Sequence, residues 1–104
     1  MDTFEKLLAD IGNRLIRLRL ISGHTSYETF ANENKLSRMQ YWRIEKGKAN
    51  LTIKSLVRVL QIHNVTVDAF FAKTFYRNFP VPLPQNNKTN KIKKRSVSMS
   101  RRYL

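Results

Sequence analysis

Five polar residues suited to begin a helix divide residues 1–79, and apolar residues at three- and four-residue spacing follow each of them. Such residues accept hydrogen bonds from the free N–H groups of a first helical turn, so they mark helix starts. Three of the five also precede Glu or Gln by three residues, which is the capping-box pattern. The predicted caps are Asp2 (with Glu5), Thr25 (with Glu28), Ser37 (with Gln40), Thr52 and Thr66. The pattern predicts an all-α fold, a compact five-helix domain.

The spacing of the apolar residues sets approximate bounds for these helices. They are expected at residues 3–21, 26–33, 38–47 and 53–63, with a fifth inside 67–76. Gly12 lies within the first of them, where glycine lowers helix stability, and therefore indicates close packing against another helix. The residues expected to face the core are Leu8, Ile11, Leu15, Leu18, Phe30, Ala31, Leu36, Tyr41, Ile44, Ile53, Leu56, Val57 and Leu60.

The charge of the chain is strongly basic and unevenly distributed. In 104 residues, 20 Lys and Arg stand against 7 Asp and Glu, which gives a net charge of +13. This balance favours a polyanion as partner, nucleic acid before an anionic membrane surface. All 7 acids lie in residues 1–79, whereas residues 80–104 begin with three prolines and hold 7 Lys or Arg. We therefore expect one domain, 1–79, and a disordered basic tail, 80–104.

Several classes of protein are disfavoured by what the sequence lacks. There is no cysteine, which excludes disulfides and thiolate metal sites. The start of the chain carries acids early, unlike a signal peptide, and no apolar run approaches the roughly 20 residues of a membrane helix. His24 and His63 are isolated, and neither a phosphate-binding glycine loop nor a catalytic triad is visible. We expect a soluble cytoplasmic protein with no cofactor, metal or enzymatic activity.

Residues 25–47 follow the plan of a helix-turn-helix unit, with two capped helices joined by a short turn. Ala31 supplies the small residue where the helices cross, and Tyr41 and Ile44 supply the packing from the second helix. Here the chain resembles the XRE family of phage-repressor-like DNA-binding regulators. The resemblance runs from Ile11 to Phe71 and is carried by IGNRLIRLR, TSYETFA, LSRMQYWRIEKGKANLT and VTVDAFF, with RIEKG as its most specific piece.

The face of residues 38–46 that Tyr41 and Ile44 leave free is the predicted DNA-reading face, and the resemblance implies the same positions. The predicted base contacts are Arg38, Met39, Gln40, Trp42 and Arg43. An arginine can bind guanine O6 and N7 together, and apolar side chains can pack on thymine methyl groups. Two alternatives stay open at this point. Met39 and Trp42 could instead be core residues, and Gln40 could serve its capping box.

Contacts to DNA phosphates are expected around the reading helix. The free N–H groups and positive end of the preceding helix, together with nearby lysines, would meet the backbone. The predicted phosphate contacts are Ser26, Tyr27, Ser37, Lys46, Lys48, Asn50, Thr52 and Lys54. For the lysines, simple solubility is the competing explanation.

The resemblance implies one ion pair, and the sequence differs from the family pattern at two positions. It implies that Glu45 pairs with Arg19 of the first helix as a scaffold contact. A glycine is usual in the turn, where Asn34-Lys35 stands, and of these asparagine better tolerates the left-handed conformation. A glutamine is usual at the start of the motif, where Ser26 and Tyr27 stand.

The whole pattern predicts a transcriptional regulator that binds a pseudo-palindromic operator in double-stranded DNA, as a homodimer. The aromatic residues Phe70, Phe71, Phe75, Tyr76 and Phe79 exceed what a short last helix can bury, so some are expected to contact a second subunit. One alternative is an antitoxin that also represses its own operon, with this aromatic patch binding the toxin; polymerase is another possible protein partner. A second alternative is a charge-driven, non-specific nucleic-acid-binding protein. The tail is expected either to contact DNA or to act as a solubilising linker.

Overall fold

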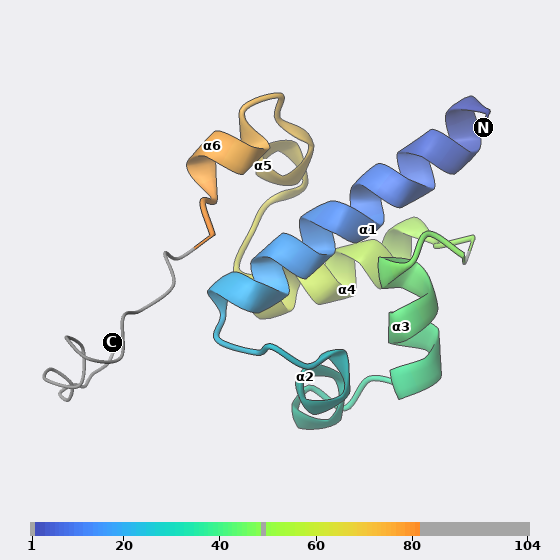
Figure 1. Cartoon of the computed structure of the whole chain (residues 1–104), viewed down its shortest axis with the longest axis vertical. Helices are drawn as coiled ribbons and strands as arrows, with labels where there is room; N and C mark the ends of the chain where they lie inside the picture. Colours follow the sequence, from blue (N-terminus) through green and yellow to red (C-terminus); the bar gives the residue numbers. More distant parts are fainter. Residues whose placement is uncertain (1, 49, 82–104) are drawn as a thin grey trace, which may run out of the picture.

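The computed structural model describes residues 2–48 and 50–81, and within these residues every regular element is an α-helix. The helices are α1 (Thr3–Ile21), α2 (Tyr27–Glu33), α3 (Arg38–Glu45), α4 (Ile53–His63), α5 (Val67–Phe71) and α6 (Phe75–Asn78). Figure 1 shows α1 crossing the molecule, with α2 and α3 below it and α5 and α6 above. The predicted all-α fold is confirmed, although the described part has six helices and not five. The tail from residue 82 onward lies outside the described residues.

Four of the five predicted helix caps are confirmed. The side chains of Asp2, Ser37, Thr52 and Thr66 each accept a hydrogen bond from a backbone N–H of the helix that follows. The prediction for α2 was wrong, because its cap is Ser26 and not Thr25. The Ser26 hydroxyl reaches the N–H groups of both Glu28 and Thr29, at 3.1 and 3.3 Å, so the capping box of Thr25 with Glu28 does not form.

Four of the helices end in the same kind of turn, in which one residue adopts a left-handed conformation and the next N–H returns to the last helical turn. At these four positions the φ angles are 93° for Gly23, 58° for Lys35, 69° for Gly47 and 58° for Asn64. The turn after α2 therefore places Lys35, not Asn34, in the left-handed region. Asn34 has a φ of −103° and donates from its side chain to the Phe30 carbonyl, at 2.9 Å.

Lys35 is the residue of these four whose side chain is least suited to its backbone, and replacing it should stabilise the protein. A left-handed conformation costs a residue with a Cβ atom about 1–2 kcal/mol, and glycine gives back part of that gain as unfolded-state entropy. Lys35→Gly is expected to raise the free energy of unfolding by about 0.5–1 kcal/mol. Asn64→Gly is the matched control and should gain less, because asparagine tolerates this conformation. Equal shifts in chemical denaturation midpoint for the two variants would contradict this account.

All six helices contribute side chains to the core. Its buried side chains are Ile11, Leu15, Leu18, Phe30, Ala31, Tyr41, Ile44, Leu56, Val59, Leu60, Phe70 and Phe75. Most of the predicted core residues are among them. Ile53 is a clear exception: it is 75% exposed, because it is the first residue of α4 and precedes the part of that helix that packs. Val57 is only partly buried, and Val59 takes the inward place that was predicted for Val57.

The segment expected as one helix at 67–76 is two, because the backbone is extended at Ala72. On one continuous helix, Phe70 and Phe75 would lie about 140° apart and could not both face the core. The break allows both to be completely buried. Arg14 of α1 stabilises it by donating from Nη1 to the carbonyls of Phe70 and Ala72, at 2.7 and 3.0 Å. The expected surplus of exposed aromatic residues is therefore smaller than predicted, with Phe71 and Tyr76 still about 40% exposed.

Candidate nucleic-acid interface

The position of α3 on α1 is set by one ion pair and one glycine. Arg19 donates from Nε and Nη2 to the two carboxylate oxygens of Glu45, at 2.7 and 3.1 Å, and both side chains are buried. This is the pair that the family resemblance implied. Gly12 lies against the backbone at the end of α3, where a Cβ atom would come within 2.9 Å of the Ile44 carbonyl oxygen. The close helix packing predicted at Gly12 is confirmed.

The electrostatics of this contact favour the charged pair. Burial opposes the charge on Arg19, but the hydrogen bond and the charge of Glu45 outweigh it and raise the pKa of Arg19. Burial raises the pKa of Tyr41, and the Glu45 carboxylate adds to this effect. The Tyr41 hydroxyl lies near the pair yet has no hydrogen-bond partner in the described part of the chain. These groups fix the inner face of α3 and leave its other face free.

The outward face of α3 carries most of the predicted base contacts. Tyr41 and Ile44 are buried, and Met39 and Arg43, one turn apart on the opposite side of the helix, are exposed. Met39 is 65% exposed, so the alternative that it belongs to the core is wrong. Trp42 lies on the flank of the helix and is partly buried, so part of its ring packs against the protein and part remains exposed for DNA.

A hollow of about 410 Å³ lies between α3 and the loop that follows it. Its lining residues are Ser37, Met39, Gln40, Arg43, Lys48 and Asn50. All six were predicted from the sequence as base or phosphate contacts. The lining includes two cationic side chains and no carboxylate, so the hollow suits an anionic or electron-rich ligand.

Several of the predicted phosphate contacts also cap helices or pack against the core. The hydroxyl oxygens of Ser26, Ser37 and Thr52 accept the capping hydrogen bonds of α2, α3 and α4, and Thr52 also donates its O–H to the Ser55 hydroxyl. The O–H groups of Ser26 and Ser37 donate to no acceptor among the described residues, so both can still donate to a phosphate. Tyr27 is partly buried and packs against the core. The lysines at 46, 48 and 54 are exposed, as is Asn50. Lysine side chains, free backbone N–H groups and the O–H groups of Ser26 and Ser37 therefore remain available for phosphates.

The capping box that competes for the Gln40 side chain is only half formed. Its backbone N–H donates to the Ser37 hydroxyl at 3.3 Å, but no return bond from its amide to Ser37 occurs in the described residues. The α1 cap, by contrast, has both bonds of the box. The Gln40 side chain is exposed at the hollow, where it can contact a ligand.

Two residues of this region make contacts that were not predicted from the sequence. The Glu28 carboxylate lies 3.5 Å from Nη1 of Arg38, and Arg58 of α4 donates from Nη2 to the Lys35 carbonyl at 3.2 Å. Glu28 was assigned to a capping box with Thr25. The adjacent Thr25 and Ser26 were the available signal, because a helix capped by Ser26 leaves the Glu28 side chain free.

The acidic side chains of the domain lie mostly away from the hollow or are paired. Asp10 pairs with Arg14 at 3.0 Å, and Glu33 with His24 at 2.8 Å. The residues described contain no group of three or more metal-ligating side chains, and none of their helices is long and apolar enough to cross a membrane.

Comparison with known proteins gives one partial relative. Over 50 residues the chain is 40% identical to the plasmid copy control protein CopR of Streptococcus agalactiae. The matched residues make up 48% of this chain and 54% of that protein, so the chain spans about half the length of the curated relative it matches. No protein-family pattern matches the chain, and no solved structure matches it significantly.

Proposed function

We propose that this protein is a sequence-specific DNA-binding regulator of transcription, which inserts α3 into the major groove of an operator. The hollow along α3 carries the proposal, because predicted DNA contacts form its whole lining. The capped helices α2 and α3, joined through the turn at Lys35, have the order of a helix-turn-helix unit of the XRE type. The similarity to a plasmid copy control protein supports a regulator and suggests control of plasmid copy number as its role.

The chemistry of each exposed side chain suggests its part in binding. Arg43 and Arg38 would bind guanine, Gln40 adenine, and Met39 with Trp42 would pack against thymine methyl groups or sugars. Lys46, Lys48, Asn50 and Lys54 would contact phosphates beside the groove, together with the backbone at Ser26, Tyr27, Ser37 and Thr52. No catalytic step is part of this function.

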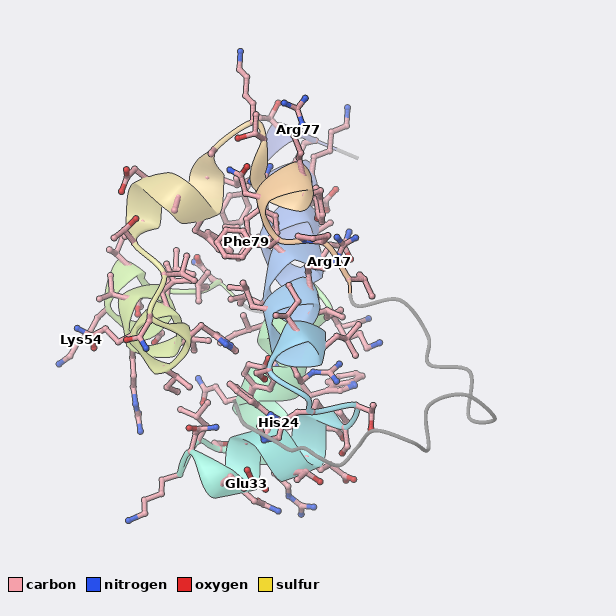
Figure 2. All side chains as sticks on the ribbon, turned by 90° about the vertical axis from the view of Figure 1, so that its left-hand side faces the viewer. Arg17, His24, Glu33, Lys54, Arg77 and Phe79 are labelled. Atoms are coloured by element: carbon pink, nitrogen blue, oxygen red, sulfur yellow. The ribbon has the colours of Figure 1, made fainter. Side chains whose placement is uncertain are left out.

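Selection of bound duplexes from random DNA tests the proposal. The intact protein is expected to enrich one operator, and Arg43→Ala is expected to relax preference at one base pair by about 1–3 kcal/mol. Arg77→Ala is the matched control, because it removes the same charge from α6. Figure 2 shows Arg77 at the end of the molecule far from His24 and Glu33 of the α2 region. Arg77→Ala should leave base preference unchanged, whereas uniform loss at all sequences with Arg43→Ala would make Arg43 a phosphate contact.

The main alternative is non-specific DNA binding driven by charge. Binding measured at physiological salt distinguishes it from sequence-specific binding. A specific protein keeps one operator at physiological salt against competitor DNA, whereas a charge-driven binder enriches none. We include the basic residues of 80–104 in the proposed interface as phosphate contacts. A chain ending at Phe79 would then show a shallower dependence of affinity on salt.

A homodimer is part of the proposal, since a pseudo-palindromic operator needs two copies about one helical turn apart. Exposed apolar side chains at Val67, Phe71 and Tyr76 offer a surface for the second copy. An antitoxin would use such a surface for a toxin instead. Two chains per selected duplex would support the dimer.

A further inference from the structure

Glu28 is the acidic residue that contacts a predicted DNA-reading side chain. It lies in the first turn of α2, and its Oε2 is 3.5 Å from Nη1 of Arg38, the first residue of α3. The carboxylate has no role in the α2 cap, because Ser26 caps that helix with its own hydroxyl. An acid in the first turn favours the dipole of α2, but an acid beside a proposed DNA surface also repels phosphates. Through its contact with Arg38, Glu28 therefore adjoins the proposed reading face.

The geometry leaves Arg38 able to bind DNA while it contacts Glu28. A guanidinium has five N–H donors in a fixed planar fork, and the contact with Glu28 engages Nη1 alone. The edge formed by Nε and Nη2 stays available for the paired acceptors of guanine. Arg38 and Glu28 are 58% and 52% exposed, so the pair faces solvent and the arginine would otherwise sample many rotamers.

We infer that Glu28 is a positioning residue for base recognition, which holds the Arg38 guanidinium toward one base pair and away from neighbouring phosphates. This inference rests on the proposed function and adds a specificity determinant on α2 to the reading residues of α3. The Glu28 charge lowers general affinity for DNA and raises the discrimination that Arg38 provides. Removing that charge should therefore change affinity and specificity in opposite directions.

The test compares Glu28→Gln with Glu33→Gln in the full chain. Both changes remove one charge from α2 at nearly constant shape, but Glu33 bonds to His24 and not to α3. Glu28→Gln is expected to lower preference at the base pair that Arg38→Ala relaxes by about two- to fivefold, the range of an exposed ion pair. Affinity for random duplex should rise at the same time. Glu33→Gln should leave base preference unchanged.

A combined variant separates positioning from a general effect of charge. In the Arg38→Ala background, Glu28→Gln should have no further effect on preference at that base pair. Full preference retained by Glu28→Gln, or lost equally in Glu33→Gln, would overturn the inference while the operator is still selected. Arg38→Ala without relaxation at any base would do the same. Failure of the unaltered protein to select any operator would instead overturn the proposed function, and this inference with it.

Discussion

Glu45→Ala is expected to lower the free energy of unfolding by about 3–5 kcal/mol, the loss typical of breaking a buried ion pair. The change leaves the Arg19 guanidinium buried, with its Nε and Nη2 donors without the acceptors they now have. A small domain has a total stability of only about 5–15 kcal/mol, so this loss would leave a substantial fraction of the molecules unfolded near physiological temperature. Thermal and chemical denaturation followed by circular dichroism measure the loss.

Replacing both partners distinguishes the cost of an unpaired buried charge from the contribution of the ion pair itself. Arg19→Met together with Glu45→Met leaves no uncompensated charge, and is expected to lose less stability than Glu45→Ala alone. Glu33→Gln, which affects an exposed pair, is the control and should change stability by less than about 1 kcal/mol. Unchanged melting of Glu45→Ala with loss of DNA binding would show that Glu45 belongs to the interface and not to the scaffold.

Gly12→Ala is the second change with a large expected effect, although it adds a single methyl group. The new Cβ atom would lie 2.8 Å from the carbonyl carbon of Glu45 and 2.9 Å from the Ile44 oxygen. Both are backbone atoms at the end of α3, so no side-chain rotation can relieve the overlap. We expect a loss of about 3 kcal/mol, at the upper end of the range for an overpacked core, because α3 must move away from α1.

Asn13→Ala is the matched control for Gly12→Ala, because it changes the next residue of α1 on the exposed face. Alanine favours helices, so this variant should be neutral or slightly more stable. A melting temperature for Gly12→Ala equal to that of Asn13→Ala would show that α1 and α3 are not packed as described. Where Gly12→Ala remains folded, DNA binding should weaken, since displacement of α3 moves the whole reading face.

The helix starts could be predicted from the sequence because a cap is a local feature. Ser37, Thr52 and Thr66 need only the N–H groups two or three residues ahead, which any chain with that spacing supplies. Two adjacent candidates, Thr25 and Ser26, could not be ranked in this way. The choice depends on where the backbone becomes helical, and Ser26 itself is extended, with φ −111° and ψ 131°.

The features that the sequence left open depend on contacts between distant residues. The break at Ala72 follows from two carbonyls that bind Arg14, 56 and 58 residues away, and from a core that accepts two aromatic rings. No periodicity in residues 67–76 contains that information. Most of the candidate site was predictable, since Tyr41 and Ile44 mark the inner face of α3. The contact of Glu28 with Arg38 was not, because it joins two helices across the turn.

Arg14 and Arg17 connect the middle of α1 to the segment of α5 and α6. Arg17 donates to the Phe79 carbonyl at 3.1 Å, a partner 62 residues away, and its guanidinium lies over the Tyr76 ring. Figure 2 shows Arg17 and Phe79 side by side. A helix of only four residues would ordinarily fray, yet α6 is held against α1 by this contact. α1 and α6 therefore belong to one cooperative unit, and separating them requires loss of the core around Phe75.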